Sequence, residues 1–223
     1  MTTTSVPPPS QGAEFERQVK RVQQDVLRMG ALVENSCWLA YRALFERDLE
    51  AAQKVKPQDK SIDKLYKQIE VDCVRLMAAQ KSTEAQVRLL SSLMQLVRDL
   101  ERIGDYAKDL SGLAMKLFAY NTSHPMMDRV RLMLERCRAM LAMSLEALVN
   151  MDAQAGRAVK AKDDAVDSDY EDLYNQLIQT PDGSVSVEMI VMMALLIRHL
   201  ERMADHSTNI GNRVVFIVTG ERR

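Results

Sequence analysis

Apolar residues recur at steps of three and four from Phe15 to the end of the chain, which is the periodicity of amphipathic helices. Short polar or helix-breaking stretches interrupt this pattern and divide it into six segments. The pattern therefore predicts an all-α protein with almost no sheet. The expected helices span residues 14–47, 49–80, 84–120, 126–150, 152–179 and 185–218.

Residues with short polar side chains stand at the starts of three of these helices. The side-chain oxygens of Asp48, Ser82 or Thr83, and Asp152 can accept a hydrogen bond from an otherwise unpaired N–H of the first turn. We therefore predict N-caps at these positions. The central interruption, at 121–125, separates three helices from three.

The two halves of the chain share a motif at an offset of 100 residues. Arg98-Asp-Leu-Glu-Arg-Ile-Gly-Asp105 aligns with Arg198-His-Leu-Glu-Arg-Met-Ala-Asp205, and five of the eight positions are identical. A second set matches at an offset of 104, namely Asp59, Asp63 and Tyr66 with Asp163, Asp167 and Tyr170.

This duplication predicts two tandem three-helix bundles related by a pseudo-two-fold axis, an arrangement similar to spectrin repeats. The expected divisions are a disordered tail over residues 1–13, a first repeat over 14–121 and a second repeat over 122–223.

Charge and composition narrow the possible functions. Lys and Arg (30) nearly balance Asp and Glu (31), so no overall field favours nucleic acid or an anionic membrane as a partner. The three cysteines are far apart and lack a C-x-x-C pair, which favours neither a disulfide framework nor a zinc site. The longest apolar run, Met189 to Ile197, is far shorter than the roughly 20 residues of a membrane-spanning helix. We therefore expect a soluble, cytoplasmic protein.

The repeated motif carries acidic residues on a face of its own. On a helical wheel of residues 93–118, one stripe is wholly apolar and is expected to be buried. Glu101, Asp105 and Asp109 are spaced by four residues and stack on nearly the opposite side, where neighbouring carboxylates repel. The corresponding residues of the second half are Glu201, Asp205 and Asn209.

Two interpretations of these acidic faces remain open. In one, the acids are solvated and pair with neighbouring arginines in a purely structural bundle. In the other, they bind a hard cation, because carboxylates one turn apart supply the oxygen ligands that Mg²⁺, Mn²⁺ or iron prefer. The repeat favours cation binding, since the acids are the same in both halves although Lys108 has become Thr208.

The predicted metal ligands come from two helices of each repeat, and they would hold divalent or trivalent ions, singly or as a multinuclear site. They are Asp59, Asp63, Glu101, Asp105 and Asp109 in the first repeat, and Asp163, Asp167, Glu201, Asp205 and Asn209 in the second.

An iron-binding enzyme or iron store is the alternative function. It is disfavoured because ferritin-like di-iron bundles use a Glu-x-x-His motif, whereas Gly104 and Ala204 stand three residues after the two glutamates. His206 could be an outer partner of a metal-bound acid. We expect no catalytic residues and no enzyme activity.

The whole pattern resembles the duplicated signature of the PhoU family. The resemblance rests on the two aligned motifs, on His206 and Asn209-Ile after the second, and on the closing Phe216-Ile-Val-Thr-Gly-Glu221, and it covers nearly the whole chain. It implies tandem three-helix bundles with an E-x-x-x-D metal motif in each. By position, the motifs are Glu101 with Asp105 and Glu201 with Asp205. The neutral Asn209, opposite Asp109, implies unequal metal occupancy.

The resemblance also implies a regulatory role and partners. Family members act as cytoplasmic negative regulators of phosphate uptake and of the phosphate-starvation response. They are thought to connect the ATPase of a phosphate ABC transporter with a sensor histidine kinase. This chain would then be a metal-binding signalling adaptor at the membrane periphery, held there by protein partners, and a homodimer.

Overall fold

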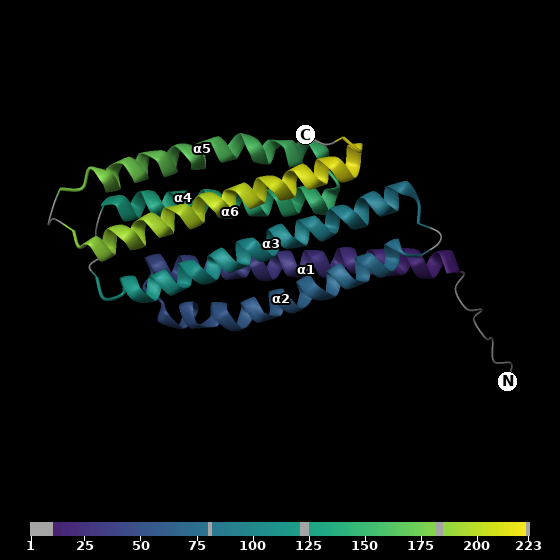
Figure 1. Ribbon diagram of the computed structural model, residues 1–223, viewed down its shortest axis with the longest axis horizontal. Helices are drawn as coiled ribbons and strands as arrows, with labels where there is room; N and C mark the ends of the chain where they lie inside the picture. The colour runs from purple at the N-terminus through teal and green to yellow at the C-terminus, as the bar shows by residue number, and fades with distance from the viewer. Residues whose placement is uncertain (1–10, 80–81, 121–124, 182–184, 222–223) are drawn as a thin grey trace.

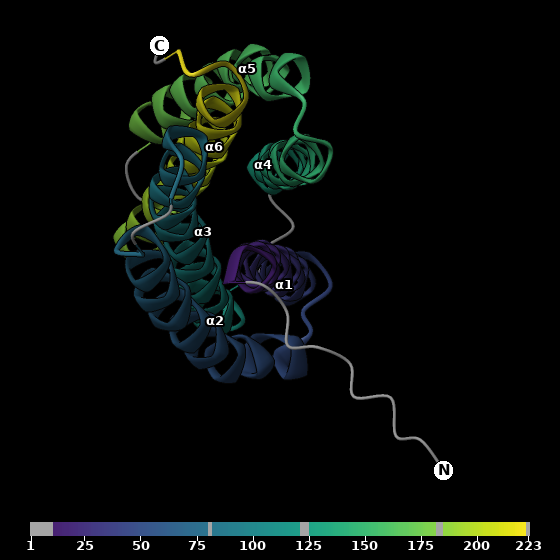
Figure 2. The ribbon, with the colours of Figure 1, turned by 90° about the vertical axis from the view of Figure 1, so that its right-hand side faces the viewer.

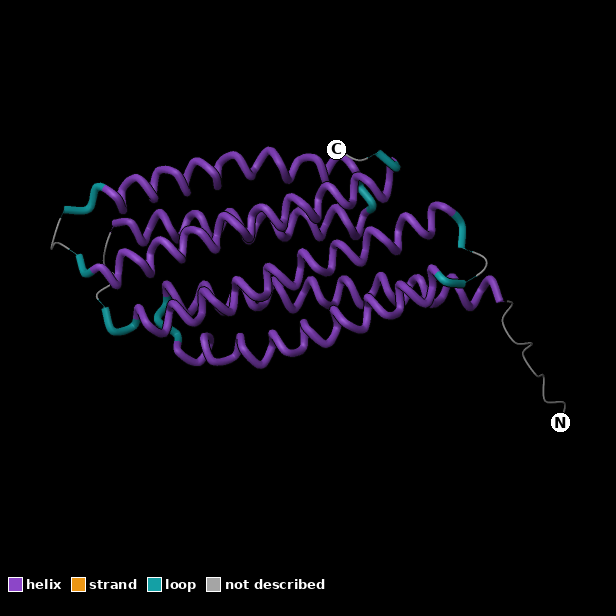
Figure 3. Tube along the Cα trace, viewed as in Figure 1, coloured by secondary structure: helices purple, strands orange, loops and turns teal. Residues whose placement is uncertain are grey.

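The computed structural model describes residues 11–79, 82–120, 125–181 and 185–221, and within these ranges it is all-helical, as predicted. Six long helices follow one another through short connections (Figure 3). The helices are α1 (Gln11–Phe45), α2 (Leu49–Met77), α3 (Glu84–Leu117), α4 (Pro125–Asn150), α5 (Ala153–Ile178) and α6 (Val187–Thr219).

The predicted N-caps are present at all three positions. The Asp48 carboxylate accepts from Ala51 N–H at 2.9 Å, and Asp152 caps α5 in the same way. Thr83 forms a capping box with Gln86, in which each side chain accepts a hydrogen bond from the other residue's backbone N–H. The first turns of α2, α3 and α5 are therefore fixed by local chemistry.

Some helix boundaries differ from the prediction. α1 begins at Gln11, inside the predicted tail, and residues 1–10 lie outside the described residues. α2 and α3 each end three residues earlier than predicted. The chain there forms tighter turns, in which a backbone N–H donates to the carbonyl three residues before it. At the end of α3, for example, Tyr120 N–H donates to the carbonyl of Leu117 at 2.9 Å.

The helices lie side by side along the long axis of the molecule (Figure 1). In the end-on view of Figure 2, α2, α3, α6 and α5 form a curved layer, and α1 and α4 lie on its inner side. α1, α2 and α3 pack on one another, as do α4, α5 and α6, and the two groups meet through α3 with α6 and α1 with α4. No described helix is long and apolar enough to cross a membrane.

The core follows from the apolar stripes of the helices. The stripe predicted over residues 93–118 is buried, with Leu93, Leu100 and Leu110 wholly inaccessible to solvent. Together with the corresponding stripe of α6, it joins one cluster of buried apolar side chains that runs through both halves. Because each such side chain contributes roughly 1.5–3 kcal/mol when buried, this shared core holds the two halves together.

Two glycines bring α5 and α6 unusually close. A Cβ atom added to Gly211 would lie 2.6 Å from the carbonyl oxygen of Gly156, and one added to Gly156 would lie 2.7 Å from that of Gly211. Both distances are shorter than any real contact of a Cβ atom, so the spacing of α5 and α6 requires glycine at both positions.

We predict that Gly211→Ala lowers the free energy of unfolding by about 1–3 kcal/mol, because α6 must move away from α5. Gly112→Ala on α3 is the matched control. Nothing lies within 4 Å of its added Cβ, so this change should raise stability by about 0.5–1 kcal/mol. Denaturant unfolding of both variants checks the pair, and a Gly211→Ala protein as stable as wild type would contradict the close contact.

Candidate functional site

The repeated acids lie on the flanks of α3 and α6 that adjoin α2 and α5. Glu101 and Asp105 are half-buried, with 21% and 27% of their side chains exposed, and so do not point straight into solvent. Asp59 of α2 and Asp163 of α5 are buried against these flanks. The structure therefore brings together acids from two helices in each repeat, as the sequence spacing suggested.

In the first repeat, a lysine joins the acids of the two helices. The Lys108 ammonium donates to Asp59 Oδ2 and to Asp105 Oδ1, both at 2.7 Å. Burial of the amine lowers its pKa, but the two hydrogen bonds to carboxylates outweigh this, and the pKa of Lys108 lies above its usual range. A permanent positive charge thus lies between α2 and α3.

Glu101 is the acid of this repeat whose pKa is raised. Its pKa is raised by burial and then by the neighbouring Asp105, while Arg102 opposes the shift and Asp63 adds to it. Desolvation and like charge both disfavour the ionised carboxyl. The ionised Glu101 is therefore under electrostatic strain that a nearby cation would relieve.

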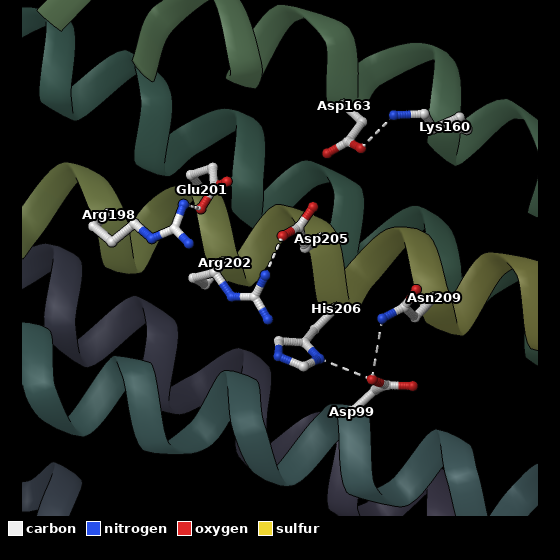
Figure 4. Close-up of polar contacts among 9 residues, drawn as sticks. All are labelled: Asp99, Lys160, Asp163, Arg198, Glu201, Arg202, Asp205, His206 and Asn209. Atoms are coloured by element: carbon white, nitrogen blue, oxygen red, sulfur yellow. Dashed lines mark hydrogen bonds and ion pairs between the residues drawn. The ribbon is translucent and has the colours of Figure 1, made fainter. Parts of the chain in front are cut away.

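In the second repeat the place of the lysine is taken by Thr208, and the buried acid is not fully paired. Only 4% of the Asp163 side chain is exposed, and its Oδ2 accepts from Lys160 at 2.8 Å (Figure 4). Among the described residues its Oδ1 has no hydrogen-bond partner, and neither has the Oγ1 of Thr208, which is also buried. A buried polar atom without a partner costs about 1–3 kcal/mol, so this arrangement needs an explanation.

The other acids of the second repeat repel one another. Burial and then Asp163 raise the pKa of Asp167, with Asp205 adding to the shift. For Glu201, burial is the main cause of a raised pKa, and Asp205 and Asp167 contribute against the opposing effect of Arg198. We call Asp163, Asp167, Glu201 and Asp205 the second acidic group. Burial and neighbouring carboxylates of this group disfavour the ionised forms of Asp167 and Glu201.

Arginines hold the outer side of this group. Arg198 donates to Glu201 and Arg202 to Asp205, both at 2.7 Å, and each pair lies within one helix turn (Figure 4). Because these ion pairs are partly exposed, each contributes roughly 0–1 kcal/mol.

Asp109 and Asn209, the third residues of the two predicted acidic faces, point away from the other predicted ligands. Every four residues rotate about 40° around a helix, so the third position lies roughly 80° from the first. Asn209 reaches across to α3, where its amide nitrogen donates to Asp99 at 3.4 Å. Asp109 is exposed, and its charge acts on His199 of α6. The structure thus does not gather Asp109 and Asn209 with the other predicted ligands.

His206 also belongs to this contact between the repeats. Its Nδ1 lies 2.8 Å from Asp99 Oδ1, and its ring lies 5.9 Å from that of Tyr106. The predicted outer partner of a metal-bound acid is therefore engaged with an acid of the other repeat.

The fit of a metal ion differs between the two repeats. Among the described residues, no group of three or more His, Cys, Asp or Glu side chains is gathered closely enough to hold one as it stands. In the second repeat the unpaired, buried Oδ1 of Asp163 nevertheless has the chemistry of a ligand for a hard cation, which prefers oxygen. In the first repeat the Lys108 ammonium already satisfies the buried Asp59, so the fit is poor.

Sequence spacing could not identify the role of Lys108. It stands three residues after Asp105 and 49 residues after Asp59, and only the packing of α2 on α3 shows that it reaches both. Lys160, three residues before Asp163, carried a local signal that could have been noticed, because residues three apart on a helix are neighbours.

The fold and the duplicated motif define a class of all-helical tandem-repeat proteins with a carboxylate group in each repeat. A family model described as the PhoU domain matches the chain twice, over residues 26–114 and 130–214. The chain belongs to the PhoU family.

Individual relatives agree with this assignment. A phosphate-specific transport system accessory protein PhoU homolog from Synechocystis is 52% identical over 208 residues, which cover 93% of this chain and 92% of that protein. The crystal structure of PhoU from Pseudomonas aeruginosa matches with a TM-score of 0.89 at 29% identity, over 93% of this chain and 100% of that one. PhoU from Streptococcus pneumoniae, titled a phosphate transport system regulatory protein, matches with a TM-score of 0.85 at 27% identity, over 94% and 99%.

The raised pKa of Glu201 predicts that this acid destabilises the metal-free fold at neutral pH. Glu201→Gln removes the repelling charge and keeps an oxygen that can accept from Arg198, so it should raise stability by about 0.2–0.5 kcal/mol. In thermal unfolding this corresponds to a midpoint about 1–2 °C higher. Glu50→Gln on α2 is the control, because Glu50 is exposed and paired with Lys54 at 3.5 Å, and should give no gain. A lower midpoint for Glu201→Gln would rule out net repulsion at this position.

Proposed function

We propose that this chain is a cytoplasmic accessory protein that negatively regulates phosphate uptake and the phosphate-starvation response. The observation that carries the proposal is the family match, which spans both repeats and is accompanied by 52% identity to a phosphate-specific transport system accessory protein homolog. These relatives support a role in the regulation of phosphate transport. As an adaptor, the chain would contact the ATPase of a phosphate ABC transporter and a sensor histidine kinase. It would have no catalytic residues of its own.

Affinity purification tests this adaptor role. The tagged full chain, taken from phosphate-replete cells solubilised in detergent, should recover the transporter ATPase and the sensor kinase, and the tag alone should recover neither. Deleting the gene should leave the starvation response switched on when phosphate is plentiful. Recovery of neither partner, together with a silent response in the deletion strain, would contradict the proposal.

We further propose that the second repeat binds a hard cation such as Mg²⁺, Mn²⁺ or an iron ion. Asp163, Asp167, Glu201 and Asp205 would hold it, with Thr208 Oγ1 beside them. Support comes from the unpaired buried oxygens and from Asp167 and Glu201, whose pKa is raised by burial and further by neighbouring carboxylates. Lys160 is no barrier, because its side chain is 55% exposed and a surface pair contributes at most about 1 kcal/mol. The bound charge would relieve the repulsion between α5 and α6 and make this flank rigid.

In the first repeat, the same role falls to Lys108. Its ammonium bridges the acids of α2 and α3, as a metal ion would, and its attachment to α3 keeps it close to them. We therefore propose that metal binds in the second repeat alone, and that Lys108 takes the place of the metal in the first. Homodimerisation stays a separate prediction.

Exchanging Lys108 and Thr208 tests whether metal binds in the second repeat alone. Wild-type protein, loaded with Mn²⁺ and then dialysed, should show metal by elemental analysis, and anomalous diffraction should place it between α5 and α6. Thr208→Lys should abolish this metal, whereas Lys108→Thr should retain it and gain a second site between α2 and α3. The reason is that each change adds or removes the competing ammonium.

Thermal unfolding in metal-free buffer gives a second, independent measurement. In metal-free buffer, Lys108→Thr should lower the unfolding midpoint, because Asp59 loses its partner, and Mn²⁺ should restore it. Metal between α2 and α3 in wild-type protein would contradict the role of Lys108. Absence of metal from every variant would end the metal proposal but leave the adaptor role to the purification experiment.

A further inference from the structure

A hollow of about 430 Å³ lies between α3 and α6, where the two repeats meet. Four arginines line it, Arg98 and Arg102 from α3 and Arg202 and Arg213 from α6. Its acidic lining residue is Asp99. The hollow therefore concentrates positive charge in a chain whose overall charge is close to neutral.

The one carboxylate does not balance the arginines, because it already has partners. Asp99 Oδ1 lies 2.8 Å from His206 Nδ1 and accepts from Asn209 at 3.4 Å (Figure 4). Within the part of the chain that the structure describes, no carboxylate lies within ion-pair distance of Arg98 or Arg213. Two of the four guanidinium groups are thus left without a counter-charge.

The other two arginines are only partly engaged. Arg102 lies 3.6 Å from both Glu101 and Asp105, and Arg202 bonds to Asp205 at 2.7 Å through one terminal nitrogen. A guanidinium carries five N–H donors, so each retains donors for a further ligand. In Figure 4 the Arg202 side chain lies on the side of α6 that faces α3, next to His206.

The mirror position in the pseudo-symmetric arrangement lacks these properties. At the offset of 100 residues, Leu113 corresponds to Arg213, so one positive charge is lost there. Asp109 takes the place of Asn209 and His199 that of Asp99, so the number of carboxylates is unchanged. The rings of Tyr106 and His199 also lie against each other there, 5.5 Å apart. The corresponding position on the other side of the pseudo-two-fold axis thus has one arginine fewer, because nothing there matches Arg213.

We propose that this hollow binds a phosphate-type oxyanion, either free inorganic phosphate or the phosphate group of a small phosphorylated molecule. Planar guanidinium groups match the spacing of phosphate oxygens and bond to them in pairs, and such charge-assisted bonds are among the strongest in proteins. Binding would draw the arginines of α3 and α6 onto one ligand and so tie the two repeats together. Arg102 and Arg202 also pair with predicted metal ligands, so the site is tested on metal-free protein. Its meaning as a direct response to phosphate rests on the proposed function.

Calorimetric titration tests the assignment on the full chain, stripped of metal and dialysed free of chelator. Inorganic phosphate and a simple phosphate monoester are titrated separately, with chloride at equal ionic strength as the blank. We expect saturable binding of at least one of them at one site per chain. Arg213→Gln should weaken it roughly tenfold or more, because a charge-assisted pair is lost.

Two further variants make the result specific. Arg213→Lys keeps the charge but loses the planar fork, and should bind with intermediate affinity. Arg21→Gln removes an exposed arginine of α1, outside the hollow, and should bind as wild type does. Binding of the monoester alone identifies its source as a phosphorylated molecule, and binding of free phosphate supports direct recognition of phosphate.

The assignment is overturned if neither compound binds at millimolar concentration, or if Arg213→Gln binds as tightly as wild type while remaining folded. Because no metal is present, this outcome is independent of the cation proposal. Recovery of the transporter and kinase in the purification experiment would likewise stand unaffected.

Discussion

The packing of α3 against α6 is the constraint on which the rest of the structure depends. Each helix buries an apolar stripe along its length, and the two stripes meet in one core that both repeats share. The charged side chains of α3 and α6 therefore lie on the flanks of these helices, beside the buried stripe. One flank of each helix adjoins its own repeat and carries the carboxylates, and the other meets the opposite repeat and carries Asp99, Tyr106 and His206. Arg102 and Arg202 connect the two flanks, because they pair with the carboxylates and also line the hollow between the repeats.

Duplication has kept the acids but not the way in which their charge is compensated. In the first repeat an ammonium of the chain joins α2 to α3. In the second, the corresponding threonine supplies no charge and a buried carboxylate oxygen lacks a donor. A single position, Lys108 or Thr208, therefore determines whether an ammonium of the repeat's last helix bridges its acids. In our proposal a cation from solution takes that place in the second repeat. Identical motifs can have different functions when a neighbour outside the motif changes.

Much of this architecture could be predicted from sequence because it depends on periodicity. The six helices, their caps at Asp48, Thr83 and Asp152, and the buried stripe of α3 all follow from local patterns. The acids of α2 and α5 were expected as further ligands beside those of α3 and α6, which requires each pair of helices to pack together, as they do. What could not be predicted depends on contacts between helices. The bridge made by Lys108 spans 49 residues, and the rotation of Asn209 toward Asp99 appears only once α6 is placed beside α3.

The glycine pair between α5 and α6 makes the two acidic groups mechanically different. Gly156 lies two turns from Asp163, so backbone against backbone sets the gap across which the second group acts. The aligned positions in the first repeat, Ala52 and Ser111, carry side chains, and there a flexible lysine spans the gap instead. In the second repeat, backbone contact fixes the distance between α5 and α6, so a cation bound there as proposed would meet a gap of set width. In the first repeat, the long Lys108 side chain can adjust its conformation if α2 shifts.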